Sequence, residues 1–557
     1  MAHELLVIGL DGATLDLVRP WAAAGRLPAL AALMRRGAWG VLRSTVPAAT
    51  FPAWTSLVTG LNPGRHGILD FTERVPGTYR VRFVNGSARR VPALWNRLGD
   101  AGRRVAVVTV PATYPPEPVN GVMVSGFDTP LTTAIDGSFV FPRALWPEIE
   151  RRVGRLPFAD FPEVTIGEGW HARARERLRD GIARRAALVR ALVARERVEA
   201  CMVVFGESDT AAHHFWRFHD PRSPRHAAVP ELAGTLAEIY EALDAAVGTL
   251  VAAMPGATVA VVSDHGSGGA SDRVVHPNRR LADAGLLTFR AGGGAGRLAG
   301  WMKAAALRAV PTRAQAALLR HVPRTAGRLE GLDRFGGIDW ARTVAYSEEL
   351  DYHPSVWLNV RGREPEGIVD PAAYAATRER VAEALRAWRD EAGRPVVARV
   401  HRREDVYAGP HAARAPDLLL ELALVDGYSP SCLRSGGPGP AIRRLPPAEH
   451  GGGKGRGMNG AHRPDGLFIL AGPEVRPAGQ LPAAAIVDVL PTLLALAGLD
   501  VPHGLDGRPI AGALRRPPRF APDRAAPLAR PRVHLDAGET REMAARLAAL
   551  GYLEPDA

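Results

Sequence analysis

Three aspartates and three histidines stand beside short apolar segments of this sequence. They are Asp11, Asp209, His213, Asp264, His265 and His462. With no cysteine among them, they offer oxygen and imidazole donors, which suit Zn²⁺ or Mn²⁺ rather than a thiolate structural site. Six donors are too many for one catalytic ion with an open position, but they suit two ions about 3.5–4 Å apart. Each aspartate alone has a simpler explanation as a helix cap or turn residue, so this prediction of a two-metal site rests on all six meeting.

A threonine offers a nucleophile for such a site. Thr50 is followed by FPAW and then by a segment expected to be helical, TSLVTG (55–60). A threonine before a helix is ordinarily an N-cap. The helix N-terminus also suits phosphate, because its N–H groups are unpaired and the dipole is positive there. A hydroxyl at that place, with its pKa lowered by a metal, would be a nucleophile at neutral pH, so cap and nucleophile both remain open.

The elements that must position these residues are short apolar strands separated by helical patterns. The strand candidates are LLVIGL (5–10), VAVVTV (105–110), CMVVFG (201–206), TVAVVS (258–263) and LFILAG (467–472), all expected to be buried and parallel. Helices are expected over residues 28–37, 93–102 and 235–254. This alternation predicts an α/β fold with a mostly parallel sheet between helices. Because ligands bind beyond the carboxyl ends of such strands, residues that follow different strands converge.

The spacing of the strands divides the chain. Residues 1–290 and 441–513 are expected to form the catalytic core, and residues 291–440 an inserted cap or specificity region, because they separate two strands by far more than one crossover needs. Within the insertion, Glu348, Glu349, Tyr352 and His353 either line a pocket or belong to an ordinary strand and turn. Residues 514–557 are expected to form a Pro/Arg-rich tail that ends in a short amphipathic helix, TREMAARLAALGYL.

Composition and charge exclude several classes of protein. The 557 residues are 46% hydrophobic and 23% charged, which fits a globular chain and neither a collagen-like nor a disordered one. The net charge of +12 comes almost wholly from scattered arginines, since Lys303 and Lys454 are the only lysines. We therefore expect no nucleic-acid partner, and we read the basic stretch 171–196 as a solvated surface helix rather than a binding face.

The sequence shows neither a recognisable targeting segment nor a cysteine pattern typical of a disulfide framework. The two cysteines, Cys201 and Cys432, cannot form a disulfide framework, and Cys201 is expected to be a buried small hydrophobe. No run reaches the roughly 18 apolar residues of a membrane span, and the first residues do not form a signal sequence. A cytoplasmic protein without a membrane partner is the expectation. The glycine-rich segments 292–296, 436–440 and 451–457 lack the P-loop pattern.

The motifs together resemble the alkaline phosphatase superfamily, and within it the type I phosphodiesterase/nucleotide pyrophosphatase family with its bacterial predicted phosphohydrolase/phosphomutase relatives. The resemblance covers most of residues 4–512. It is carried by LLVIGLDG, PAATFPAWTSLVTGLNPGRHGI, ESDTAAHHFW, VVSDHG and GAHRPDGLFIL. It implies an alkaline phosphatase-like fold with an inserted cap.

The resemblance also implies a division of labour at the site. One ion would be held by Asp209, His213 and His462, and the other by Asp11, Asp264 and His265. Thr50 would bridge the ions, attack phosphorus and form a phosphothreonine that water then hydrolyses. Zn²⁺ is the expected metal, with Mn²⁺ as the alternative, and the partner is a small phosphorylated substrate. The oligomeric state is left open.

One departure from the family pattern bears on the substrate. Relatives usually have Asn directly after the Thr-Phe-Pro unit, where Ala53 stands here, followed by Trp54. This weakens a nucleotide assignment. Arg65, His66 and Lys454 are alternative donors, although Arg65 is more simply a loop charge and His66 a packing residue.

The first expectation for function is a metal-dependent phosphohydrolase that cleaves phosphodiester or pyrophosphate bonds. A phosphomonoesterase or phosphomutase using the same site is the alternative, and a non-catalytic protein of the same fold comes third. A sulfatase is disfavoured, because the Thr50 segment lacks the C/S-x-P-x-R motif.

Overall fold

A large sheet built from the predicted apolar segments organises the chain. The computed structural model describes residues 4–129, 137–153, 169–290, 335, 337–350, 353–451, 457–523, 525, 528, 530–536, 538–540 and 542–544. Within them the main sheet has 10 strands in the order β19-β2-β18-β9-β1-β8-β5-β6-β7, with β20 beside β2. The strands are β1 (Leu5–Leu10), β2 (Ala38–Arg43), β5 (Val105–Val108), β6 (Gly121–Val124), β7 (Val140–Phe141), β8 (Ala200–Phe205), β9 (Thr258–Val262), β18 (Asp465–Ala471), β19 (Gly479–Gln480) and β20 (Ala484–Ala485).

The centre of the sheet is parallel, as predicted, but one expected strand direction is wrong. β1 pairs in parallel with β8 and β9, and β5 pairs in parallel with β8 and β6. β18, which contains the expected run 467–472, is antiparallel to both β9 and β2. An apolar run reports that a strand is buried on both faces, and burial does not determine which way the strand runs.

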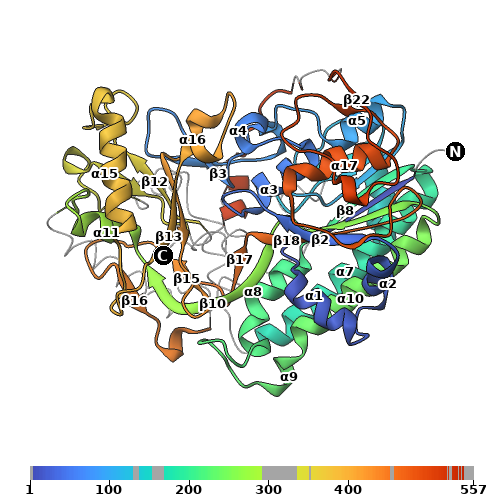
Figure 1. Cartoon of the computed structure of the whole chain (residues 1–557), viewed down its shortest axis with the longest axis horizontal. Helices are drawn as coiled ribbons and strands as arrows, with labels where there is room; N and C mark the ends of the chain where they lie inside the picture. The colour runs from blue at the N-terminus through green and yellow to red at the C-terminus, as the bar shows by residue number, and fades with distance from the viewer. Residues whose placement is uncertain are drawn as a thin grey trace.

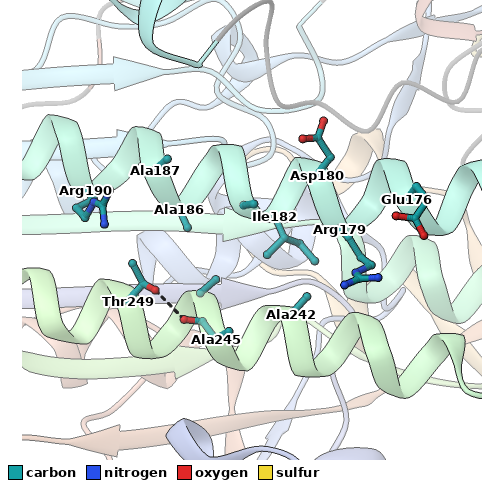
Figure 2. Close-up of a pocket in the computed structure, with 12 residues that line it drawn as sticks. Glu176, Arg179, Asp180, Ile182, Ala186, Ala187, Arg190, Ala242, Ala245 and Thr249 are labelled. Carbon is teal, nitrogen blue, oxygen red and sulfur yellow. Dashed lines mark hydrogen bonds between the residues drawn. The ribbon is translucent and has the colours of Figure 1, made fainter.

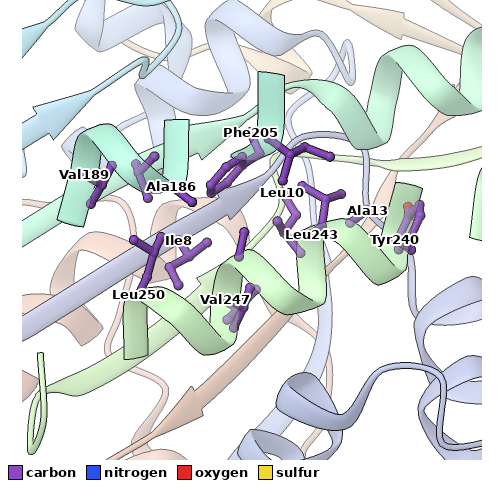
Figure 3. Packing of buried hydrophobic residues seen from close by; sticks show 14 of the residues in the cluster. Ile8, Leu10, Ala13, Ala186, Val189, Phe205, Tyr240, Leu243, Val247 and Leu250 are labelled. Atoms are coloured by element: carbon purple, nitrogen blue, oxygen red, sulfur yellow. The ribbon is translucent and has the colours of Figure 1, made fainter. Parts of the chain in front are cut away.

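Helices cover both faces of the sheet, again as predicted. They are α1 (Leu15–Ala23), α2 (Pro28–Arg36), α7 (Trp170–Glu196), α8 (Glu207–His219) and α10 (Thr235–Ala253) on one face and α3 (Thr50–Thr59), α5 (Leu94–Asp100) and α17 (Val489–Leu496) on the other. Alternate residues of β1 supply the two cores: Leu6 and Ile8 face the first set of helices, and Leu5 and Val7 face the second. Figure 3 shows Ile8 and Leu10 packed against α7 and α10.

The basic stretch 171–196 lies wholly within α7. Its apolar side, including Leu178, Ile182 and Val189, is buried against the sheet and α10, while most of its arginines are exposed. An amphipathic surface helix is therefore the correct description of this segment, with Arg185 as a buried exception.

A smaller lobe lies beside the main sheet (Figure 1). It contains an antiparallel sheet in the order β11-β12-β14-β13, together with two helices. These elements are β11 (Ala345–Ser347), β12 (Ser355–Leu358), β13 (Val397–Arg402), β14 (Leu418–Leu422), α11 (Pro277–Asp283) and α15 (Tyr374–Arg386). β10 (Gly266–Val275) links the lobes, because it pairs with β17 (Gly460–Arg463) near one end and with β15 (Ser429–Cys432) and β16 (Ile442–Arg444) toward the other.

The described part of the C-terminal tail returns to the main lobe. Val533 N donates to Ser87 Oγ (2.9 Å), Val533 O accepts from Asn85 Nδ2 (3.0 Å), and Met543 is buried beside Phe51. The expected terminal helix lies mostly outside the described residues.

Two further expectations concern single features of the chain. Cys201 is buried, as predicted, and burial raises the pKa of its thiol to about 12. Among the described helices, none is both long and apolar enough to span a bilayer.

Candidate metal centre

The predicted ligands come from four strands that meet at one edge of the main sheet. Asp11 directly follows β1, and Asp264 and His265 follow β9. Asp209 and His213 lie on α8, directly after β8, and their i, i+4 spacing puts them on the same side of the helix. His462 lies on β17, just before β18. Because β18 is antiparallel, its first residues lie where the parallel strands end.

The six side chains form two groups. In the Asp11 group (Asp11, Asp264 and His265), His265 Nε2 lies 3.5 Å from Asp11 Oδ1 and 3.4 Å from Asp264 Oδ2. In the Asp209 group (Asp209, His213 and His462), the two histidine Nε2 atoms lie 3.3 and 3.6 Å from the carboxylate oxygens of Asp209 and 3.1 Å from each other.

The two groups touch through their histidines. The rings of His265 and His462 stack with centroids 3.7 Å apart. Ligand atoms of Asp209, His265 and His462 also lie within 4.8 Å of one another, as do those of the Asp11 group. His265 therefore belongs to both neighbourhoods, which the spacing of the sequence did not indicate.

Backbone carbonyls fix the tautomer of all three histidines. His213 Nδ1 lies 2.9 Å from Gly460 O, His462 Nδ1 lies 2.7 Å from Ala48 O, and His265 Nδ1 lies 3.0 Å from Gly266 O. A carbonyl oxygen only accepts, so each Nδ1 carries the proton. Each Nε2 lone pair then faces the carboxylates, which is the form that a metal ligand needs.

The pKa shifts of the buried aspartates and histidines indicate that a positive charge would stabilise this centre. Burial raises the pKa values of Asp11 and Asp264 well above their usual range, and the charges of neighbouring aspartates raise them further. Burial would also raise the pKa of Asp209, but the neighbouring histidines, His213 first, hold it below its usual range. Burial, helped by the charge of His265, lowers the pKa of His462.

Three buried donor atoms make the same point. Asp11 Oδ1, Asp264 Oδ2 and His265 Nε2 have no hydrogen-bond partner among the described residues. Buried polar atoms without partners are costly, and a cation between them would satisfy all three. The donors present therefore fit a divalent metal.

Thr50 is the first residue of α3 and is fully buried. The cap interpretation, one of the two left open for Thr50, is wrong: Ala49 occupies the cap position, and the helix already includes FPAW, because Pro52 is tolerated in a first turn. The flanking residues contact both groups. Ala48 O accepts from His462, and the Trp54 indole N–H donates to Asp11 Oδ2 (2.9 Å). The start of α3 thus lies between the two groups.

Trp54 is a site residue that sequence reasoning missed. Its ring packs against β1 at Gly9, where any side chain would overlap the indole. The sequence offered one signal, the departure from the family motif at Ala53, directly before Trp54.

The other proposed donors are engaged elsewhere. Arg65 Nη1 donates to Asp506 Oδ1 and to Gly504 O, both at 2.7 Å. His66 is buried with its Nε2 2.9 Å from Ser56 Oγ, and burial followed by the charge of Arg89 lowers its pKa to about 3. Both match their simpler interpretations. Lys454 lies outside the described residues.

Of the four candidate pocket residues of the insertion, two have structural contacts and one lines a cavity. Glu348 accepts from Trp357 Nε1 (3.0 Å), and Glu349 accepts from the backbone N–H groups of Asn278 and Ser435. These two are structural. His353 lines a cavity of about 350 Å³ that also has His213 and His462 in its wall. Tyr352 lies outside the described residues.

A larger groove of about 640 Å³ lies between α7 and α10, on the outer face of the helical layer (Figure 2). Its described lining is mainly alanine, with Glu176, Arg179, Asp180 and Arg190 at its edges, and contains none of the six ligands. The cavity beside the metal centre is therefore the one relevant to chemistry there.

Comparison with known proteins identifies the family of the chain. Residues 5–431 match the sequence model of the type I phosphodiesterase/nucleotide pyrophosphatase family. No curated protein sequence matches the chain. Phosphonoacetate hydrolase from Sinorhizobium meliloti 1021, solved with phosphonoformate, is similar in fold, with a TM-score of 0.51, 16% identity, and coverage of 89% of this chain and 96% of that one.

Human ectonucleotide pyrophosphatase/phosphodiesterase 5 is also similar, with a TM-score of 0.47, 13% identity, and coverage of 90% and 97% of the two chains. The family match spans well over half of the sequence. The chain therefore belongs to the type I phosphodiesterase/nucleotide pyrophosphatase family, within the alkaline phosphatase superfamily, and is a hydrolase of phosphoester bonds.

Proposed function

We propose that this chain cleaves phosphodiester or pyrophosphate bonds at a two-metal site, with Thr50 as the nucleophile. The observation that carries the proposal is the meeting of six donor side chains, three of whose buried atoms lack a hydrogen-bond partner among the described residues, beside the first turn of α3.

The residues divide between the ions as follows. Asp11, Asp264 and His265 would hold one ion, and Asp209, His213 and His462 would hold the other. Carboxylate and imidazole donors without thiolate favour Zn²⁺, with Mn²⁺ as the alternative. When bound, two such ions lower the pKa of a hydroxyl and neutralise phosphate charge.

The residues of the chain then perform a double displacement. The Thr50 hydroxyl loses its proton, and its oxygen attacks phosphorus in line with the departing oxygen; a phosphothreonine forms as the leaving group's bond breaks, and the departing oxygen takes up a proton. The oxygen of a water molecule then bonds to phosphorus as the bond to the threonine oxygen breaks, and a proton from that water restores the hydroxyl. The N-terminal N–H groups of α3 would stabilise the charge of phosphate oxygens placed at this end of the helix.

A diester fits the surroundings better than a monoester. The cavity of about 350 Å³ beside His213 and His462 has room for a second substituent on phosphorus. Arg463 is the only arginine or lysine among its described lining residues, so the extra negative charge of a monoester would find little compensation there.

Thr50→Ala tests the proposal. The purified variant should keep two equivalents of metal, measured by elemental analysis, and lose hydrolysis of bis-p-nitrophenyl phosphate by a factor of about 10³ or more. Thr55→Ala is the matched control, because Thr55 lies on the same helix and, among the described residues, its hydroxyl bonds only Phe51 O (2.7 Å). Full activity of Thr50→Ala would overturn the nucleophile assignment. A higher kcat/KM for p-nitrophenyl phosphate than for the diester would overturn the diester preference.

A further inference from the structure

The cavity beside the metal centre lies between the two lobes. Its main-lobe wall includes Val46, Met458 and the ligands His213 and His462. Its other wall comes from the smaller lobe, where β14 and the loop after it contribute the partly exposed Leu422 and the exposed Leu424. Leu420 also borders the cavity, but its side chain is buried in the core of that lobe. A substrate whose phosphorus lies at the metals therefore extends one substituent into this space.

Much of the cavity wall is aliphatic. Besides Leu422 and Leu424, Val46, Pro354 and Met458 line it, and none of the described lining residues is Phe, Tyr or Trp. A nucleobase is usually held by stacking on aromatic rings, and His353 is the one ring among the described lining residues that does not belong to the metal centre. Aliphatic walls of this kind instead bind a group by removing its CH₂ surface from water.

The charges at the cavity disfavour an anionic substituent. Glu421 lines it, with its carboxylate paired to His401 Nε2 at 2.6 Å. Arg463 donates Nη2 to Gly427 O (2.7 Å) and to Gly269 O (3.4 Å), so its guanidinium is partly used by the backbone. A second phosphate or a carboxylate placed here would meet Glu421 without a dedicated cation.

We propose that this cavity binds an uncharged aliphatic substituent of the phosphate, so that the substrates are phosphodiesters of aliphatic alcohols rather than nucleotides. This inference rests on the proposed function, because it places the phosphate at the two metals. It assigns Leu422, Leu424 and Glu421 as specificity residues, the leucines by attraction of CH₂ groups and Glu421 by exclusion of anions.

Binding of phosphonates to the zinc-loaded protein tests the proposal directly. Isothermal titration calorimetry would compare methylphosphonate, hexylphosphonate, 6-phosphonohexanoate and AMP. Complete burial gives up to about fourfold in affinity per methylene. We expect the Kd of hexylphosphonate to be at least about tenfold lower than that of methylphosphonate, and lower than that of 6-phosphonohexanoate. Equal Kd values for the methyl and hexyl compounds, or tightest binding of AMP, would overturn the aliphatic assignment.

Variants locate the effect in the cavity. Leu424→Asp should remove most of the preference for hexyl over methyl. Phe520→Asp is its match, since Phe520 is 52% exposed and Leu424 53%, yet Phe520 lies outside the cavity, so the preference should persist. Glu421→Gln should reduce the difference between the Kd values of hexylphosphonate and 6-phosphonohexanoate. An unchanged preference in Leu424→Asp would move the alkyl site elsewhere.

The same preparation separates failure of this inference from failure of the proposed function. If bis-p-nitrophenyl phosphate is hydrolysed but chain length has no effect on binding, only the aliphatic assignment fails. If the metal-loaded protein binds hexylphosphonate tightly but hydrolyses no diester, the proposed function fails and the binding preference stands.

Discussion

At the scale of single residues, Trp54 determines which carboxylate oxygen of Asp11 is available to a metal. The indole N–H holds Asp11 Oδ2, and this leaves Oδ1 directed at His265. Hydrogen bonds of this kind to a ligand carboxylate typically change metal affinity by about 10–100-fold when removed. We predict that Trp54→Phe weakens binding of one metal equivalent by that factor, as measured by competition with a chelator.

Trp95→Phe is the control for this prediction. Trp95 also donates its indole N–H to a buried carboxylate, Glu117, but that pair lies away from the six ligands. The Trp95→Phe variant should therefore keep the metal affinity of the wild type. Equal loss of metal in both variants would show that general loosening of the fold, and not the orientation of Asp11, is responsible.

The sequence predicts the ligand residues and not their positioning residue, for a physical reason. Asp and His are the chemically expected ligands, and their place beside apolar strands is visible in the chain. The bond from Trp54 to Asp11 spans 43 residues and depends on α3 beginning at Thr50 rather than after FPAW. The start of a helix is set by packing as well as by local residues, and the printed sequence alone did not reveal it.

At the scale of elements, a buried ion pair fixes the helix that carries Asp209 and His213. Glu207 opens α8, and Arg185 of α7 donates to both of its carboxylate oxygens at 2.6 and 2.5 Å. We predict that Arg185→Met destabilises the protein by about 3–5 kcal/mol, because it leaves a buried charge unpaired. The double variant with Glu207→Gln should recover part of that loss. Denaturant midpoints measure both, and an unrecovered double variant would contradict the argument.

Glu349 joins three segments of the smaller lobe and makes its stability depend on pH. Burial raises the pKa of Glu349 from 4.5 to about 7. Between these values the folded chain keeps a proton that the unfolded chain has lost, so stability falls as pH rises through this window. At about 1.4 kcal/mol per pKa unit, the effect is roughly 3–4 kcal/mol.

The measurement for Glu349 is a comparison of melting temperatures with Glu349→Gln. The variant loses an acceptor for Ser435 N–H, so its absolute stability is lower at acid pH. The difference in melting temperature between the wild type and Glu349→Gln should become smaller from pH 5 to pH 8, because only the wild-type carboxyl ionises. A constant difference between the two proteins across that range would argue that Glu349 titrates normally.

The direction of β18 shows what a strand pattern can and cannot predict. LFILAG identifies a buried strand, and residues 465–471 form one. If β18 ran parallel to its neighbours, His462 would lie at the opposite edge of the sheet from the other ligands. Its antiparallel pairing with β9 brings His462 to them. The convergence of the ligands was therefore predicted correctly, although one of the strand directions used to predict it was wrong.

At the scale of the whole molecule, the metal centre is built by one lobe and the cavity beside it by both. The metal donors all come from the main lobe, whereas the cavity needs the smaller lobe as its second wall. β10 begins directly after His265 and runs on to pair with β15 and β16. The sequence could predict the donors from their strands, but not a cavity whose walls are residues 46 and 420–424.

The tail also acts at this scale, because it closes an apolar cluster at the start of α3, the helix that carries the proposed nucleophile Thr50. Met543 is buried with Ala49 and Phe51, the two neighbours of Thr50 in the chain. We predict that Met543→Asp frees the tail and lowers kcat for bis-p-nitrophenyl phosphate by about tenfold or more, because small displacements of a reacting group are costly. Met543→Leu, which preserves the apolar volume, should retain activity. Limited proteolysis should cut the tail of the Asp variant faster. Rapid cleavage with unchanged kcat would mean that the tail only covers the cluster, and that the main lobe alone holds Thr50 in place.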